Sequence, residues 1–288
     1  MRSKKPQYRR YTRSTFGNIV YFTILFLAGA FTILPLVYCV ITSFKPLDEL
    51  LIFPPQFFVK RPTLSNYLEL PSLLGKMQVP VLRYFFNSIF IAIAGTSLHI
   101  IAASMAAFTF SKSRIRGRTI YFMIIQIMLL YNSVTLSVPQ YLIFTKLHMI
   151  DTYWVYILPA RPSAVGCFLM KQFMDASVPD TLMEAARIDG AGVLRMYAKI
   201  IMPILKPAWM TILLLSFQSM WTIIPNGTIF SEQLKALPQV MSTIATGGIA
   251  RSGSAMAVTV LLMIPPIVVF LITQGNVMET MSTSGIKE

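Results

Sequence analysis

The side chains that could do chemistry in this 288-residue chain are few and widely spaced. It has two histidines, His99 and His148, and two cysteines, Cys39 and Cys167, and no such pair has the spacing of metal ligands. The apolar stretches contain no paired carboxylates, no H-E-x-x-H helix and no G-x-S-x-G turn. The Gly75–Lys76 pair lacks the upstream glycine and the Ser or Thr of a phosphate-binding loop. We therefore expect no catalytic site, no metal site and no cofactor bound by this chain.

A different signal lies in residues 177–207, which read SVPDTLMEAARIDGAGVLRMYAKIIMPILKP. Pro179 and Asp180 suit the first turn of a helix, the proline through its fixed φ and the aspartate through the helix dipole. Thr181 and Glu184 are also spaced as a capping box. The pattern predicts a short helix that begins near residue 180.

Gly190 is expected to end this helix, because glycine adopts the left-handed conformation of a helix end without strain. A second helix over about 193–202 then runs into Pro203. The small side chains of Ala185 and Ala186 leave a low surface that a partner protein could approach closely. The pattern favours a protein-docking element on the inner membrane surface. The alternative is an interfacial helix, which needs only amphipathicity.

The composition is that of a membrane protein. Hydrophobic residues make up 55% of the chain and charged residues only 12%, which is too few charges to cover a soluble globule of this size. The formal charge of +14 could indicate nucleic-acid binding, but the cations lie between apolar segments and do not cluster with aromatic stacking residues. This placement follows the positive-inside rule, so the predicted surroundings are a lipid bilayer and not nucleic acid.

Six stretches are long and apolar enough to cross a bilayer, and each must be helical because hydrocarbon offers no hydrogen-bond partner to the backbone. They cover about 18–43, 84–110, 119–142, 152–171, 204–224 and 253–274. The first is longer than the apolar core of a secretory signal and is expected to remain uncleaved. Cations are densest in the N-terminal tail and in 111–118, so both termini are predicted to be cytoplasmic.

These features predict an all-α integral membrane protein with about six transmembrane helices. Its expected parts are a basic cytoplasmic tail (1–17), a first transmembrane helix with an outer loop (18–83), a core of five transmembrane helices that includes 177–207 (84–276), and a cytoplasmic tail (277–288). A second outer loop spans about 225–252.

The segment 177–207 resembles the EAA motif of permease subunits of bacterial ABC importers. The match consists of Glu184-Ala185-Ala186, three residues, Gly190, nine residues, Ile200, and Pro203 after one further residue and a hydrophobic position. The resemblance extends over about 15–288 and is strongest to the carbohydrate branch, which includes the smaller permease of the maltose transporter. Further matching phrases are Pro62–Leu64, Asn66–Tyr67, Asn87–Ser88, Ala106–Phe108, Arg116–Arg118, Pro139–Tyr141 and Asp151–Trp154.

The resemblance implies a type I ABC importer permease fold and a set of partners. These are a second permease subunit, a cytoplasmic ABC ATPase dimer that binds ATP and Mg, an extracellular or periplasmic solute-binding protein, and a saccharide. The chain itself would be non-catalytic, in the bacterial inner membrane, and would form half of the translocation path. The implied ATPase-coupling residues are Glu184, Ala185, Ala186, Arg187, Asp189, Gly190, Ile200 and Pro203. The loop 225–252 is expected to reach toward the solute-binding protein.

Candidate residues of the substrate path are polar or aromatic side chains within the spans, which combine hydrogen bonding with flat apolar faces suited to sugar rings. They are Tyr131, Asn132, Arg161, Gln218 and Trp221. The alternative is that Tyr and Trp form interfacial belts and that Asn and Gln join helices. Arg161 would cost roughly 2.5–3.5 kcal/mol at a bilayer centre, unless it lies near an interface and its side chain reaches water.

Three other functions remain as alternatives. A permease of the same architecture could import another small solute, such as an amino acid or an osmolyte. A membrane-embedded enzyme would need the catalytic patterns that the spans lack. A secondary transporter would usually carry ionisable residues at mid-membrane and an internal repeat, and apart from Arg161 the sequence has neither.

Overall fold

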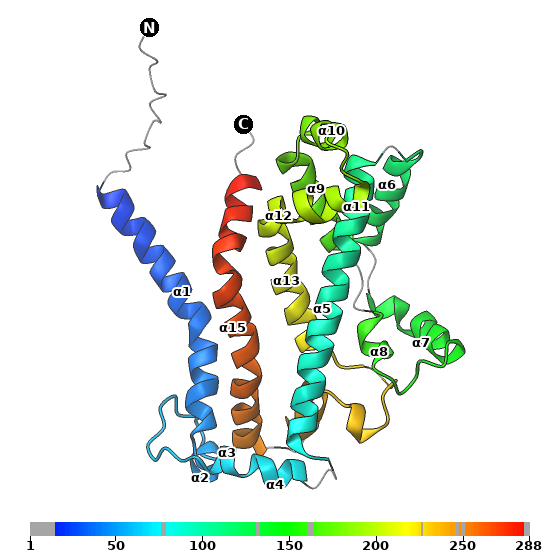
Figure 1. Cartoon of the computed structure of the whole chain (residues 1–288). Helices are drawn as coiled ribbons and strands as arrows, with labels where there is room; N and C mark the ends of the chain where they lie inside the picture. The colour runs from blue at the N-terminus through cyan, green and yellow to red at the C-terminus, as the bar shows by residue number, and fades with distance from the viewer. Residues whose placement is uncertain are drawn as a thin grey trace.

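The computed structural model describes residues 15–75, 79–113, 115–130, 133–159, 164–225, 227–245, 248 and 251–284. Every regular element within these ranges is a helix, as predicted. The longest are α1 (Thr15–Ser43), α5 (Val81–Lys112) and α15 (Ser252–Ser284). In Figure 1 they run the length of the molecule, with α15 beside α1. All three are long and apolar enough to cross a membrane, which confirms the first, second and sixth predicted spans.

The fifth predicted span is one arm of a bent pair. The first arm comprises α11 (Val193–Met196), the π-helical turn Tyr197–Ile201 and α12 (Met202–Ile204), and the second arm is α13 (Lys206–Trp221). The two arms meet at an angle of 80° and are together long enough to cross. Pro207 has no N–H to donate to the carbonyl of Pro203 one turn earlier, so the helical hydrogen-bond ladder is interrupted at the bend.

The third and fourth predicted spans, 119–142 and 152–171, are divided in the structure. The first contains α6 (Arg118–Met128), the 3-10 turn Ser133–Leu136 and part of α7 (Ser137–Lys146). The second contains α8 (Trp154–Ile157) and the first half of α9 (Ala164–Ser177). Neither α6, with 11 residues, nor α9, with 14, reaches the ~20 residues that a continuous span needs. Pro159 lies just after α8, where it cannot continue the hydrogen-bond ladder, whereas Pro139 lies in the first turn of α7, where a proline is tolerated.

Apart from α10, the remaining helices are short and lie toward one end of the molecule. They are α2 (Leu47–Leu50), α3 (Ser65–Leu68), α4 (Leu70–Gly75), the 3-10 turn Glu232–Leu234 and α14 (Leu237–Ala245). In Figure 1, α2, α3 and α4 lie at the end opposite to α10 (Asp180–Ile188). The outer loop predicted after the first span therefore contains three short helices.

Asn66 joins this connection to two long helices. Its buried amide donates hydrogen bonds to the carbonyls of Ser43 and Lys45, each at 2.8 Å, where α1 ends. On its other side lies Gly253 of α15, where an added Cβ would overlap the Asn66 side chain. The close approach therefore requires glycine at position 253.

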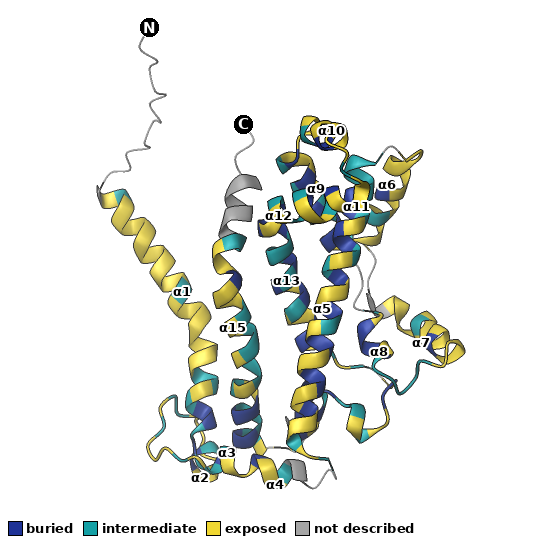
Figure 2. Cartoon of the chain, in the orientation of Figure 1, coloured by how far each residue is buried: buried dark blue, intermediate teal, exposed yellow. Residues whose placement is uncertain are grey.

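Burial differs sharply among the long helices (Figure 2). The 18-residue apolar stretch of α1 that would cross a membrane contains no buried residue. Phenylalanines such as Phe16, Phe26 and Phe31 are at least 75% exposed. In contrast, α5 buries residues along its whole length, including polar ones such as Asn87 and His99. An apolar surface as extensive as that of α1 suits lipid or a partner helix and not water.

Candidate functional site

The predicted docking segment, residues 177–207, forms a short helix, a glycine turn and a bent second helix. The first helix, α10, starts at Asp180 after Pro179, whose extended backbone (φ −66°, ψ 147°) marks the boundary. The predicted capping box is wrong: Pro179 is the N-cap, no side chain caps the helix, and Thr181 is already its second residue. Glu184 instead points into solvent.

Gly190 ends α10 as predicted. Its φ of +75° is left-handed, and its N–H donates to the carbonyl of Arg187 at 3.0 Å. The N–H of Ala191 donates to the carbonyl of Ala186 at 2.9 Å, which completes a Schellman motif. A Cβ at Gly190 would meet no atom within 4 Å, so the backbone conformation alone favours glycine here.

The two faces of α10 have different roles. Met183 and Ala186 are buried in a cluster that also contains Met170, Met174 and Ala107. The opposite face exposes other members of the predicted coupling set: Glu184, Ala185, Arg187, Asp189 and Gly190. The two alanines of the motif therefore differ, since Ala186 packs inward and Ala185 faces outward.

The remaining two coupling candidates lie elsewhere in the segment. Ile200 is half-buried against the same cluster, and Pro203 is exposed beside the bend. The structure adds three exposed apolar side chains that the sequence pattern did not single out: Ile188, Val193 and Leu194 are 86%, 60% and 76% exposed. We call Glu184, Ala185, Arg187, Ile188, Val193 and Leu194 the docking face. The sequence signal for the added residues is their position immediately around the glycine turn.

A lysine from the end of α5 binds the start of α10. The Lys112 Nζ donates to the carbonyl of Val178 at 2.6 Å and to Oδ1 of Asp180 at 2.8 Å. The Lys112 side chain is 6% exposed, whereas that of Asp180 is 84% exposed. The hydrogen bond and charge of Lys112 lower the pKa of Asp180. From the sequence alone, Lys112 is only one of the cations of 111–118.

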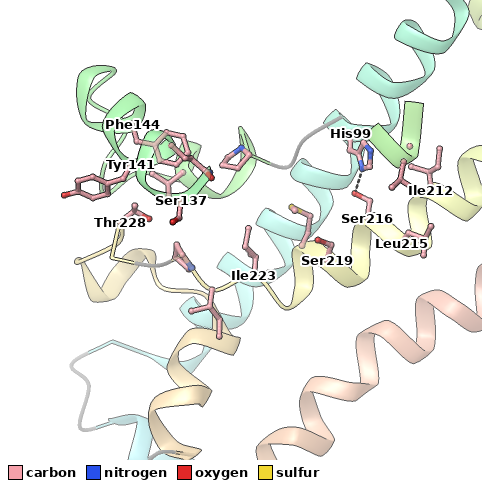
Figure 3. A pocket seen from close by; sticks show the side chains of 18 of the residues that line it. His99, Ser137, Tyr141, Phe144, Ile212, Leu215, Ser216, Ser219, Ile223 and Thr228 are labelled. Carbon is pink, nitrogen blue, oxygen red and sulfur yellow. Dashed lines mark hydrogen bonds between the residues drawn. The ribbon is translucent and has the colours of Figure 1, made fainter. Parts of the chain in front are cut away.

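A cavity of about 760 Å³ lies between α5, α7, α9 and α13. On one wall, His99 Nδ1 and Ser216 Oγ are hydrogen-bonded at 2.8 Å (Figure 3). Tyr141 and Phe144 of α7 supply aromatic faces on the other side. The polar side chains of the lining are those of His99, Ser137, Gln140, Tyr141, Ser216, Ser219 and Thr228.

Of the residues that we predicted for the substrate path, the two that the structure describes, Gln218 and Trp221, are not among those that line this cavity. Trp221 is 2% exposed, stacks on Phe217 and donates from Nε1 to the carbonyl of Leu262 at 3.0 Å, so it packs between α13 and α15. Gln218 is exposed and does not line the cavity. Tyr131, Asn132 and Arg161 lie outside the described residues. The cavity instead uses polar residues of the same apolar stretches, such as His99 and Ser216.

At the opposite end from α10, residues 228–237 form what we call the outer segment, after its predicted side. Asp151, in a left-handed conformation (φ 60°), accepts hydrogen bonds on Oδ1 from the N–H groups of Phe230 and Ser231, each at 2.9 Å. The Ser231 hydroxyl donates to its other oxygen. These bonds lower the pKa of Asp151, and the bond from the Ser231 hydroxyl has the largest effect.

Helix α5 binds the outer segment as well. Asn87 is fully buried, and its Nδ2 donates to the carbonyls of Gln233 and Lys235 at 2.8 and 2.9 Å. Its Oδ1 accepts from the Tyr153 hydroxyl at 2.8 Å, and the Ser88 hydroxyl accepts from the N–H of Leu237 at 2.7 Å. The outer segment is thus held in place by buried polar groups and not by apolar packing alone.

Comparison with known proteins identifies the family. Residues 70–282 match the model of the family described as "Binding-protein-dependent transport system inner membrane component". The chain is 27% identical to the arabinooligosaccharides transport system permease protein AraQ of Halalkalibacterium halodurans, over 88% of this chain and 91% of the relative. It is 30% identical to the sn-glycerol-3-phosphate transport system permease protein UgpE of Yersinia enterocolitica, over 70% and 73% of the two chains.

A solved structure has the same fold. It is the crystal structure of a bacterial ABC transporter involved in the import of the acidic polysaccharide alginate, with a TM-score of 0.72 and 24% identity, over 94% of this chain and 99% of that one. The all-helical fold predicted from the sequence is therefore that of an ABC importer permease. The chain belongs to the family of binding-protein-dependent transport system inner membrane components, and is a multi-pass protein of the bacterial inner membrane.

Proposed function

We propose that this chain is the permease subunit of an ABC importer for a sugar or oligosaccharide and forms half of the translocation path. The observation that carries the proposal is the exposed docking face on a helix closed by Gly190, at the spacing of the EAA motif. The chain is non-catalytic in this proposal, and a separate ABC ATPase dimer binds ATP and Mg. The other expected partners are a second permease subunit and a solute-binding protein.

The docking face would seat on the ATPase. Ile188, Val193 and Leu194 supply apolar contact area, and Glu184 and Arg187 supply charges at its edge. The first residues of α1 and the last described residues of α15 lie toward the same end as α10 (Figure 1), which supports a common cytoplasmic side for them. ATP can then drive transport only if the closed ATPase dimer binds one conformation of the permease more tightly than the other.

The cavity supports a saccharide as the transported solute. Its volume lies within the roughly 300–1,000 Å³ of small-molecule sites. The His99–Ser216 pair and Gln140 can exchange hydrogen bonds with sugar hydroxyls, and Tyr141 and Phe144 offer flat apolar faces to the ring carbons. The names of several relatives point the same way: arabinooligosaccharides for AraQ, lactose for LacG of Rhizobium radiobacter, and galactooligosaccharides for GanQ of Bacillus subtilis.

A second candidate function is import of another small solute by the same architecture. The specific observation in its favour is the relative UgpE, which is named for sn-glycerol-3-phosphate and not for a saccharide. An uptake panel separates the two. A strain that lacks only this chain should lose uptake of one or more labelled oligosaccharides and keep that of glycerol-3-phosphate, amino acids and glycine betaine. Loss confined to a non-saccharide would establish the second candidate.

Docking is tested with a matched pair of isoleucine variants. Ile188→Ser removes apolar area from the docking face, and Ile115→Ser makes the same change at a 49% exposed position between α5 and α6. We expect Ile188→Ser to weaken co-purification of the ATPase about tenfold, since loss of ~1.4 kcal/mol corresponds to this factor. Ile115→Ser should co-purify normally. Equal retention of the ATPase by both variants would refute docking through this face.

A further inference from the structure

Helix α5 is attached to the docking segment at one end and to the outer segment at the other. We propose that α5 is the rod that transmits movement between these two surfaces, and that Lys112 and Asn87 are the positioning residues that fasten its ends. The inference rests on the proposed function, because it assumes that the ATPase docks on one surface and the solute-binding protein on the other.

The fastening at the docking end is built around a buried cation. Lys112 contacts Val178 and Asp180, the two residues on either side of the N-cap Pro179, so it holds the point where α10 begins. About one helical turn before Lys112 in α5, Ala107 and Phe108 lie in the same cluster as Met183 and Ala186. A displacement of α10 therefore displaces the end of α5.

A second bond joins α5 to the docking segment beyond the glycine turn. The Ser104 hydroxyl and the Tyr197 hydroxyl are 2.6 Å apart, and the Tyr197 ring lies against Phe108. The docking segment is thus attached to α5 on both sides of Gly190. Rotation of α10 about a single pivot would break one of the two attachments.

At the other end, a single buried amide makes three bonds. Asn87 donates to the carbonyls of Gln233 and Lys235 and accepts from the Tyr153 hydroxyl. Because the side chain is fully buried, these bonds have no water to replace them. The outer segment is consequently bound to α5 and moves with it.

Between the two fastenings α5 is one unbroken helix without an internal proline. Asn87 and Lys112 are 25 positions apart, which corresponds to about 37 Å of helix at ~1.5 Å per residue. A second route from the docking segment, through α13, contains a π-helical turn and a bend of 80°. Such a bend can absorb movement by changing its angle, whereas α5 cannot. His99 lies between the two fastenings, so the rod also carries one wall of the cavity.

The test measures communication and not transport of an unidentified sugar. The complete importer is reconstituted in proteoliposomes, and its ATPase activity is measured with and without the solute-binding protein. Lys112→Met keeps the apolar stem and removes the donors, and Asn87→Leu keeps the size and removes the amide. We expect both complexes to assemble and to keep their basal ATPase activity. Stimulation by the binding protein should fall about tenfold, within the 5–150-fold range of typical allosteric couplings.

Matched controls make one identical and one similar change elsewhere. Lys146→Met alters an exposed lysine at the end of α7, and Ser97→Leu replaces an exposed polar residue of α5 by leucine. Both should keep full stimulation. The double variant Lys112→Met with Asn87→Leu should lose no more than either single variant, because a rod released at one end no longer transmits. If the loss of stimulation in the double variant equals the product of the two single losses, the two residues act independently, and the proposal that α5 acts as a rod is overturned.

Gentler variants cover the case in which the first two do not assemble. Tyr197→Phe and Ser88→Ala each delete one hydroxyl from a fastening, and each should lower stimulation about fivefold, the low end for allosteric couplings. Wild-type stimulation in both, in an assembled complex, would overturn the inference while leaving the proposed function intact. If the wild-type chain itself forms no complex with an ABC ATPase, the proposed function fails instead.

Discussion

The outer end and the docking end of the molecule differ in what their polar and apolar side chains contact. At the outer end, Asp151, Asn66 and Asn87 direct their hydrogen bonds inward, to the backbone of this chain. At the docking end, α10 is held from behind and leaves large apolar side chains such as Ile188 in solvent. The difference teaches that the outer segment is fixed by hydrogen bonds within this chain, whereas α10 presents apolar side chains that suit contact with a partner.

The largest effect is expected from a substitution that overpacks the outer end. Gly253→Val adds a Cβ and two methyl groups where Asn66 leaves no room. We expect a loss of about 1–3 kcal/mol, the usual cost of overpacking, through displacement of Asn66 from Ser43 and Lys45. A thermal unfolding assay in detergent should show a lower midpoint. An unchanged midpoint would mean that the contact between α15 and the loop is not structural.

At the docking end, Gly190→Ala tests whether the shape of the docking face matters for the ATPase more than for the stability of the chain. Left-handed backbone costs an alanine about 1–2 kcal/mol, and no neighbouring atom adds a clash. Because α10 is only nine residues long, this strain should act locally. We expect weaker ATPase co-purification with little change in the unfolding midpoint. Gly192→Ala, at a glycine with φ −68°, is the control and should bind the ATPase normally.

The smallest expected effect is a loosening of the outer segment by acid. The pKa of Asp151 is lowered by its bonds to Ser231 and Phe230, so its contribution to stability is complete above the ordinary aspartate value of about 3.9. The contribution is lost as the pH falls from there through the lowered pKa. Hydrogen exchange of residues 228–235 should therefore be equally protected at pH 7 and at about pH 5, and less protected below about pH 4.

Asp151→Asn provides the reference for this pH dependence. The amide cannot accept all three bonds as a carboxylate does, so the free energy of opening should be lower at neutral pH by about 1 kcal/mol. This is below the ~1.5–3 kcal/mol of charged hydrogen bonds because the site is partly exposed. Its exchange should also be insensitive to acid over this range. An acid response that persists in the variant would assign the loosening to another group.

The sequence by itself determined the features that depend on neighbouring residues. Pro179 and Gly190 act on their own backbone, and they placed both ends of α10 to within a residue or two. Apolar length fixed α1, α5 and α15 as spans, because a bilayer imposes the same requirement on any helix. The spacing from Glu184 to Pro203 likewise indicated the family that the comparisons then identified.

Tertiary structure alone decided which polar residues meet. His99 and Ser216 are 117 positions apart and form one wall of the cavity, while Trp221, predicted for the path, turns its indole to Leu262. It also decided that 119–142 and 152–171 are divided helices, since neither their apolar length nor the prolines in them reveal whether a span continues with a kink or breaks. The physical reason is common to both: local rules act along one helix, whereas a cavity depends on the rotation and packing of four helices at once.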